Sequence, residues 1–505
     1  MKRIHSVVRS RWFGPVVLAL VALVARVVAS RHYWGWEEED FTNVNLAWAM
    51  LQHGADGVSQ DYPPVFYALS ALLGLVLEPI DLATLTVTMA GGVATVVLAF
   101  VLGRAVWNDR VGWLAGLLCC LQPQLLLYSS SPLREPFYAA ISLLGVWFVL
   151  RRRHAGAAAS FGLAGLTRYE GTAANLPFHL AAVFVDRVPL RRLVGPALAW
   201  AGLFAAWVVF QGVQTGEWNP LSNTFAMNVT DAPTSDRDSA FEWLGASARV
   251  SVGFWGWVFP QMLGPLLPLA ALGALVTALR SSDRERRLLA AWFGLQLGLF
   301  AGIVFVGQFD PPGHPLYRKW STLLCALVCL FGAAGLDGFF ALARRRGVGR
   351  GLRGAVAAAA LLVTAVPFAA EIDEELTRSE RTVAPQVRIA HWLEASYPRG
   401  TAFLLDQITL FRMDRRDHGF ELLQWGYLPA WSDDGRGWAE GPEALGRYLA
   451  EKRVRVVLWC KEEWTQGPVI APYLEAPEDH ELGPVTLRLM HADEAYGFRL
   501  YQVVY

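Results

Sequence analysis

The chain is 505 residues long, with 54% apolar and 17% charged residues. Soluble proteins carry about 25% charged residues, so this composition argues against a purely cytosolic enzyme. The 44 basic residues balance the 44 acidic ones, which excludes the basic excess of a nucleic-acid-binding protein and an acidic disordered tail. The five cysteines are too few to indicate a disulfide framework, and their positions suggest no zinc site.

Apolar stretches fill the first 371 residues. A helix needs about 17 to 25 apolar residues to cross a hydrocarbon core of about 30 Å, and some of these stretches are shorter. We interpret the first stretch as an uncleaved helix rather than a signal peptide, because ten further spans follow it. The eleven predicted spans are 12–30, 83–103, 111–128, 133–150, 155–167, 172–185, 193–213, 251–279, 288–307, 320–343 and 354–371.

The arginines concentrate in every second loop, and Lys2 and Arg3 precede the first span. Cytoplasmic loops are enriched in basic residues, so we expect a cytoplasmic N-terminus. Counting the apolar segment 64–77 as a span would place the arginines at 151–153 outside. We therefore predict that 64–77 lies on the outer membrane surface, within a long first external loop of residues 31–82.

The composition changes after residue 371, so we divide the chain into a membrane domain, 1–371, and a soluble domain, 372–505. An odd number of spans places the soluble domain outside the cytoplasm. Alternating apolar residues predict strands over 401–405, 454–459, 487–490 and 498–503, and a helix over 442–452. The whole chain is therefore predicted to be mainly α, a polytopic membrane protein with a small C-terminal α/β domain.

Four adjacent carboxylates, residues 37–40, follow Trp36 just outside the first span. Like charges this close repel one another, so the cluster is unfavourable unless something uses it. One interpretation is a solvated turn in which Asp40 caps a helix over 42–50. Another is a functional site, in which Glu38 and Asp40 form a minimal oxygen-ligand set for a hard divalent cation.

Two charged segments interrupt the apolar region. Arg134-Glu135-Pro136 opens the fourth span, where a carboxylate either caps the helix or faces a site. Thr167-Arg168-Tyr169-Glu170-Gly171 separates two short apolar segments, and Arg168 and Glu170 either pair with each other or line a wet pocket. The candidate site residues of these two segments are Glu135, Arg168 and Glu170.

A third charged segment, residues 310–320, precedes the tenth span and contains His314, Tyr317, Arg318 and Lys319. Lys and Arg are normally enriched in cytoplasmic loops, so cations at the outer membrane interface are unusual and favour an anionic partner. A lipid phosphate is the obvious candidate. The alternative is that they extend to lipid headgroups.

Together these motifs resemble membrane glycosyltransferases of the GT-C fold. They are the acidic first loop, Tyr62-Pro63-Pro64-x-x-Tyr67, the carboxylate Glu135, the TRYEG segment and His314-Pro-x-Tyr317-Arg318. The closest branch contains the protein mannosyltransferases and the lipid A aminoarabinose transferase. The resemblance covers about residues 12–345. Each motif by itself is loose, and the specific feature is the order of the motifs along the chain.

The resemblance implies transfer of a sugar from a polyprenyl-phosphate donor to an acceptor hydroxyl. Glu39 and Asp40 stand where the family has an Asp-Glu pair, in reversed order, and Glu135 resembles the second acidic position. The implied donor-phosphate ligands are Arg168, Arg318 and Lys319. The implied substrate pocket comprises Glu38, Tyr62, Tyr67, Glu170, His314 and Tyr317.

The implied chemistry needs a carboxylate to accept the acceptor's proton and cations to stabilise the leaving phosphate. Direct displacement would invert the anomeric centre. No cofactor is assigned, although a divalent cation fits Glu38 and Asp40. The acceptor is a glycolipid, a polysaccharide or a protein, membrane lipids surround the chain, and no nucleic-acid partner is expected.

The arginine- and alanine-rich composition suggests a GC-rich bacterial source and hence the bacterial cytoplasmic (inner) membrane. Two other function classes stay open at this point. One is a transporter or flippase of a lipid-linked sugar, in which Arg168 and Glu170 gate a midplane site. The other is an assembly or receptor protein in which the acidic residues are structural.

Overall fold

A computed structural model describes residues 12–31, 38–54, 62–215, 218, 240–307, 315–382, 384–405, 421–424, 441–460, 474, 476–493 and 498–505, except that the side chains of 38–41 and 315–317, among others, are not described. Contacts divide the chain into two compact units. The first comprises Met1–Tyr33 and Thr42–Glu375, and the second comprises Trp34–Phe41 and Leu376–Tyr505. Each unit is described separately.

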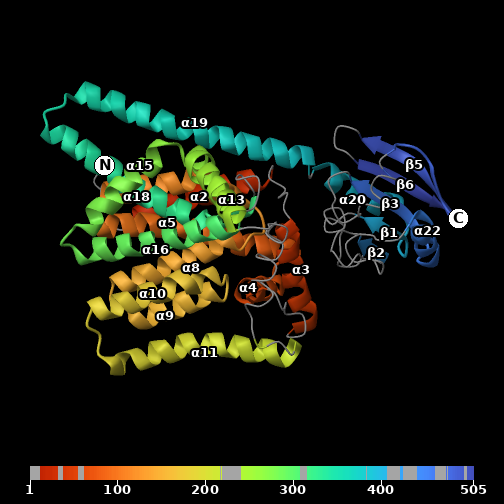
Figure 1. The fold of residues 1–505 in the computed structure, drawn as a ribbon, viewed down its shortest axis with the longest axis horizontal. Helices are drawn as coiled ribbons and strands as arrows, with labels where there is room; N and C mark the ends of the chain where they lie inside the picture. Colours follow the sequence, from red (N-terminus) through yellow and green to blue (C-terminus); the bar gives the residue numbers. More distant parts are fainter. Residues whose placement is uncertain are drawn as a thin grey trace. The chain divides into compact units, whose positions relative to one another are not determined.

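The described part of the first unit is helical (Figure 1). Its helices up to the predicted fifth span are α2 Phe13–Ser30, α3 Glu38–His53, α4 Val65–Gly74, α5 Ile80–Val106, α6 Asp109–Leu121, α7 Pro123–Leu127, the 3-10 turn Tyr128–Ser130, α8 Glu135–Leu150 and α9 His154–Gly165. The helices that follow are α10 Glu170–Val185, α11 Leu190–Thr215, α13 Ala240–Gly253, the π-helical turn Phe254–Val258, α14 Phe259–Leu263, α15 Leu266–Leu279, α16 Arg284–Gly307, α17 Pro315–Trp320, α18 Thr322–Arg345 and α19 Arg350–Thr382.

The chain is a multi-pass membrane protein, but the predicted count of eleven spans is not confirmed. Among the described residues, six helices are long and apolar enough to cross a membrane, or up to eight if each bent pair counts as one span. The difference comes from short and bent helices. Predicted spans 133–150, 155–167 and 172–185 correspond to helices of 16, 12 and 16 residues, and 111–128 is bent by 68°.

Helix α5 forms the centre of the bundle, because small residues let its neighbours approach closely. It packs against α2, α4, α6 and α8. A methyl group at Gly91 would lie 2.5 Å from the Cα of Phe137 on α8, and one at Gly103 would lie 3.1 Å from the Cα of Gly112 on α6. Such contacts give van der Waals packing between helices where lipid supplies no hydrophobic driving force.

The predicted first loop contains two helices, α3 and α4. The ten-residue α4, Val65–Gly74, lies within the segment predicted to rest on the membrane surface. Helix α3 begins at Glu38 rather than after Asp40. The alternative in which Asp40 caps a helix over 42–50 is therefore wrong, because Asp40 lies inside the first turn and its backbone is already helical.

The second unit contains a six-stranded mixed sheet with the order β2-β1-β3-β6-β5-β4. β1 is parallel to β2 and β3, and the remaining pairs are antiparallel. Predicted strands and the helix all appear with boundaries shifted by a few residues; β2 and β4 were not predicted. The bounds are α20 Ala384–Ser396, β1 Ala402–Leu405, β2 Glu421–Gln424, α22 Pro442–Glu451, β3 Val454–Cys460, β4 His480–Leu482, β5 Val485–Asp493 and β6 Phe498–Val504.

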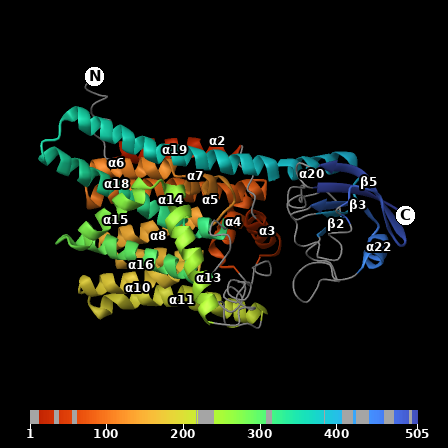
Figure 2. The ribbon, with the colours of Figure 1, turned by 45° about the horizontal axis from the view of Figure 1, so that its top comes forward.

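Helices cover both faces of this sheet (Figure 2). Leu404 and Val457 pack with Leu445 and Leu449 of α22 on one face. On the other face, strand residues that alternate with them pack with α20. All four residues of β1 are buried for this reason, which explains its continuous apolar run.

Candidate functional site

Four of the predicted site residues line one pocket in the first unit. They are Glu135, Arg168, Glu170 and Lys319. They come from the start of α8, the turn between α9 and α10, the start of α10, and α17. The wall opposite is formed by α16 and the beginning of α18.

Helix α5 positions Glu135. The hydroxyl of Thr88 donates a hydrogen bond to the carbonyl oxygen of Leu133 at 2.9 Å, and Thr95 donates to that of Pro136 at 3.3 Å. Gly91, between these threonines, lets the start of α8 lie directly on α5. The backbone on both sides of Glu135 is therefore fixed, and its side chain is buried.

Arg168 joins the two carboxylates of the pocket. Its guanidinium forms an ion pair with Glu135, and its Nη2 donates to Oε1 of Glu170 at 2.9 Å. The turn that carries it is tight, because the Arg168 amide donates to the carbonyl of Ala164, and the amide of Gly171 donates to that of Arg168, both at 2.9 Å. The paired interpretation of Arg168 and Glu170 is confirmed, and Glu135 belongs to the same network.

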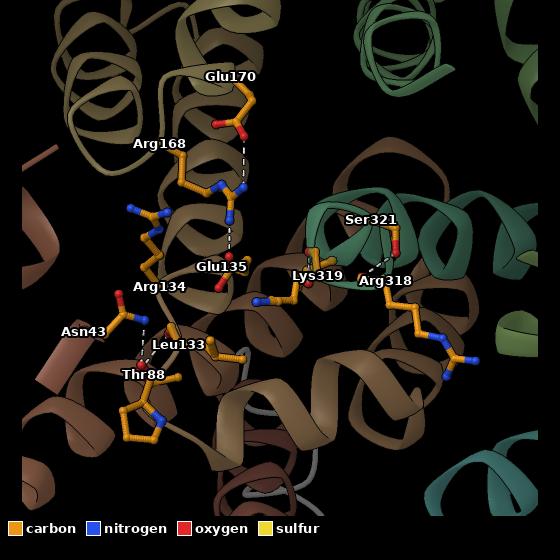
Figure 3. A network of polar contacts seen from close by, with 12 residues as sticks. Asn43, Thr88, Leu133, Arg134, Glu135, Arg168, Glu170, Arg318, Lys319 and Ser321 are labelled. Carbon is orange, nitrogen blue, oxygen red and sulfur yellow. Dashed lines mark hydrogen bonds and ion pairs between the residues drawn. The ribbon is translucent and has the colours of Figure 1, made fainter. Parts of the chain in front are cut away.

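Arg318 and Lys319 are adjacent in sequence but point in different directions. Figure 3 shows the Lys319 side chain extended toward the Glu135–Arg168 pair and the Arg318 side chain directed away from it. Arg318 forms ion pairs with Glu371 and Glu375 of α19, the second at 2.9 Å. The structure therefore does not bring Arg318 into the pocket with Lys319.

A network that the sequence did not predict lies beside the pocket. Arg134 donates from Nη1 to the hydroxyl of Tyr67 at 3.0 Å, and its guanidinium lies 4.6 Å from the centre of the Tyr62 ring. The Tyr67 hydroxyl in turn donates to Oδ1 of Asn43 at 3.0 Å, and Asn43 donates to the carbonyl of Pro132 at 2.9 Å. The two predicted tyrosines therefore belong to one cluster with Arg134.

Sequence reasoning missed Arg134, Asn43 and Gln296 as residues of the site region. Arg134 had a signal, since it is a cation beside a candidate carboxylate in a mainly apolar region. Gln296 lines the pocket from α16 and donates to Oδ1 of Asn175 at 3.2 Å. In the sequence, Gln296 stands out only as a polar residue inside an apolar span. That observation alone does not distinguish a residue that packs against another helix from one that binds a ligand.

The charged residues of the pocket balance one another, and its backbone adds positive ends. Among the described residues that line it, the two cations are Arg168 and Lys319 and the two carboxylates are Glu135 and Glu170, while Arg134 lies in the cluster beside it. The N-terminal ends of α8, α10 and α18 all contribute to the lining, and helix N-termini favour negative charge. Burial lowers the pKa of Lys319 to about 7, because the charged ammonium loses its hydration.

The pocket is small in this structure. Its volume is about 30 Å³, which is room for about one or two water molecules. A sugar phosphate is much larger, so the pocket must widen before such a ligand enters. The ion pair between Arg168 and Glu135 fills part of the space that an entering anion would take.

Several predicted residues lie outside the described part. His314 is not described, and neither are the side chains of Glu38, Glu39, Asp40 and Tyr317. Within the described residues, no group of three or more His, Cys, Asp or Glu side chains is arranged to hold a metal ion. The predicted cation ligands Glu38 and Asp40 are not among the side chains searched, so that site stays a prediction.

Comparisons with known proteins identify the fold. No protein-family model matches the sequence, and a search of curated proteins finds no significant match. Solved structures do match. ArnT from Cupriavidus metallidurans bound to undecaprenyl phosphate superposes with a TM-score of 0.58, at 14% identity, over 97% of this chain and 98% of that one.

The chain has the GT-C fold. Further GT-C neighbours are structures of the Archaeoglobus fulgidus oligosaccharyltransferase. The apo form superposes with a TM-score of 0.53 at 11% identity, over 90% of this chain and 70% of that one. A complex of AglB with an inhibitory peptide and a dolichol-phosphate gives 0.52 at 12% identity, over 89% and 70%. A third structure of this enzyme contains Zn and sulfate.

Proposed function

We propose that the chain is an inverting glycosyltransferase that moves a sugar from a polyprenyl-phosphate donor to an acceptor hydroxyl. In this proposal, the reaction takes place at the outer face of the bacterial cytoplasmic membrane. The observation that carries the proposal is the buried pocket at the N-termini of α8, α10 and α18, lined by Arg168 and Lys319 together with two carboxylates, within a GT-C fold. A GT-C neighbour bound to undecaprenyl phosphate and another bound to dolichol-phosphate support the class of donor.

Arg168 and Lys319 are the proposed donor-phosphate ligands. Both are buried in the unliganded pocket and face the same small cavity. As the anomeric bond breaks, charge develops on the leaving phosphate, and fixed cations in a dry site stabilise that charge better than water does. In this mechanism the phosphate replaces the carboxylate of Glu135 at Arg168, and Glu135 is released to contact the sugar or the acceptor.

Asp40 and Glu39 are the proposed general base, as the resemblance implies, and they belong to the first turn of α3. A sugar or serine hydroxyl is a weak nucleophile, so a carboxylate that takes its proton contributes about 100- to 10,000-fold to the rate. The acceptor hydroxyl gives its proton to the base and attacks the anomeric carbon from the face opposite the phosphate, and the lipid phosphate leaves with the electrons of the broken bond. The proposed reaction therefore inverts the anomeric centre. Glu38 and Asp40 are retained as proposed ligands of a divalent cation.

Mass spectrometry of lipid extracts from cells with and without the gene tests the proposal. We expect the deletion strain to lose one glycosylated product and to accumulate a polyprenyl-phosphate sugar. Complementation with the wild type should restore both, while Asp40→Asn with Glu39→Gln should not. An unchanged lipid and glycan profile would contradict the proposal. Full complementation by the double variant would favour a flippase, because transport does not need the proposed base.

A further inference from the structure

A second cavity lies in the first unit, far along α18 from the pocket. It is a groove of about 1210 Å³. The pocket is lined by residues 319–324 at the start of α18, whereas the groove is lined by residues 334–342 and 345 near its end. Helix α15 forms the opposite wall, and Val356 and Ala360 of α19 contribute to the lining.

The floor of the groove is made of small residues on two parallel helices. Gly332 lies against Leu267, and Gly335 lies against Ala270, so α15 and α18 run in the same direction. A Cβ at Gly335 would be 2.1 Å from the carbonyl oxygen of Ala270, whereas nothing lies within 4 Å of a Cβ at Gly273. The helices therefore touch along one line, and an open slot runs beside it.

The groove has apolar walls and one cationic end. Leu269 and Phe339 expose 68% and 53% of their surfaces along it. Because α15 and α18 are parallel, Arg280 at the end of α15 and Arg345 at the end of α18 lie at the same end. Arg286, in the first turn of α16, belongs to this end too, since its Nε donates to the carbonyl of Val106 at the end of α5 at 3.2 Å.

The charges at this end do not cancel. The lining contains these three arginines and one carboxylate, Asp337. Asp337 accepts a hydrogen bond from Nδ2 of Asn108 at 2.9 Å. Asp283, which does not line the groove, lies 3.5 Å from Arg286. The lining therefore carries a net positive charge, which suits a phosphate group.

The length of the groove suits a lipid of one leaflet. Helix α15 has 14 residues, which corresponds to about 21 Å of helix. Half of a hydrocarbon core is about 15 Å thick. Acyl chains of one leaflet can therefore lie along the small residues of α15 and α18 while the phosphate remains at the arginines.

We propose that this groove is a specific binding site for an anionic glycerophospholipid. Its two acyl chains lie against α15 and α18, and its phosphate is held by Arg280, Arg286 and Arg345. The site is separate from the proposed catalytic pocket and does not depend on the proposed reaction. The bound lipid fills the space between α15, α18 and α19 and holds their cationic ends together.

Native mass spectrometry of the full chain, released from mixed phosphatidylglycerol and phosphatidylcholine vesicles, tests the proposal. We expect the wild type to retain phosphatidylglycerol preferentially. Each arginine should contribute about five-fold to the preference for phosphatidylglycerol. The variant Arg280→Gln/Arg286→Gln/Arg345→Gln should therefore lose all three contributions. The control Arg344→Gln/Arg346→Gln/Arg350→Gln removes the same charge from neighbouring residues that do not line the groove, and should keep the preference.

A second pair of variants tests occupancy without changing charge. Gly273→Phe places a ring in the groove and should reduce bound phosphatidylglycerol at least five-fold, in line with loss of the site. Gly302→Phe, where a Cβ also meets open space but which is not in the lining, should leave it unchanged. Equal retention of both lipids by the wild type, retention unaffected by Gly273→Phe, or displacement by undecaprenyl phosphate would overturn the proposal.

Discussion

Arg318 and Lys319 are neighbours in the chain, yet their surroundings predict different effects of substitution. Lys319→Met removes a buried cation from the pocket and should raise the dissociation constant for a polyprenyl-phosphate sugar roughly 10- to 100-fold, the value of a charged hydrogen bond. Arg318→Gln should leave donor affinity within about two-fold, because Arg318 pairs with Glu371 and Glu375 instead. Binding of a fluorescent donor measures both.

Arg318→Gln should act on stability instead. Glu371 and Glu375 are nearly fully buried, so the variant leaves two buried carboxylates without this cation and should cost about 3 kcal/mol. Thermal unfolding in detergent measures the loss. A weaker donor affinity in Arg318→Gln with an unchanged unfolding midpoint would instead support the role that the resemblance assigned to this residue.

The pKa of Lys319 predicts a pH dependence of donor binding. Burial lowers this pKa to about 7 in the unliganded pocket, and a bound phosphate raises it by favouring the charged ammonium. Donor affinity should therefore be fully present below pH 7 and fall by up to about tenfold per unit as the pH rises above 7. A phosphodiester donor does not itself titrate in this range.

Lys319→Arg is the matched control for this prediction. The arginine stays charged throughout the range, so donor affinity should become independent of pH between about 6 and 9. Isothermal titration at several pH values in two buffers also reports the proton taken up on binding. A wild-type affinity that is constant across this range would show that Lys319 does not contact the phosphate.

For single residues, the sequence was sufficient to predict ionisable side chains that line the pocket but not which side chains form ion pairs with one another. Glu135, Arg168, Glu170 and Lys319 were singled out because ionisable groups in an apolar region are costly. Whether a side chain points into a pocket or toward another helix depends on tertiary packing. For this reason Arg318, which has the same sequence signal as Lys319, was assigned the same place.

At the scale of helices and strands, regular apolar patterns were predicted well and short elements were not. The alternating apolar residues of β3 and β6 and the amphipathic pattern of α22 were sufficient to place them. β2 and β4 have four and three residues, too few for a period to appear, whereas the equally short β1 was predicted because its residues form a continuous apolar run. The predicted count of eleven spans is not confirmed for a related reason, since α8, α9 and α10 are shorter than a full crossing.

The contact between α15 and α18 gives a prediction at this scale. Gly335→Ala places a methyl group 2.1 Å from the backbone oxygen of Ala270, so the helices must separate. We expect a loss of about 1 to 3 kcal/mol, measured as a lower midpoint of thermal unfolding in detergent. Gly302→Ala, where a Cβ meets nothing within 4 Å, should be neutral or stabilising. Equal midpoints for the two variants would contradict the close crossing.

At the scale of the whole molecule, the arginine distribution predicts the orientation in the membrane. Alkaline phosphatase fused after Tyr505 should be active, because the soluble domain is predicted to lie outside the cytoplasm, and a green fluorescent protein fused there should be dark. A fusion after Arg153, in a predicted cytoplasmic loop, is the control with the opposite expected pattern. A fluorescent C-terminal fusion would require an even number of spans and would place the carboxylates and the soluble domain on opposite sides.

Turnover of a donor by the purified chain is the decisive test of sugar transfer from a lipid phosphate. With a polyprenyl-phosphate sugar and an acceptor lipid extract, the wild type should release free polyprenyl phosphate. Glu39→Gln/Asp40→Asn should lower kcat about 100- to 10,000-fold, whereas Arg151→Gln, an exposed arginine outside the pocket, should retain full activity. Release of no polyprenyl phosphate from any donor would contradict the proposed activity, and full activity in the double variant would contradict the proposed base.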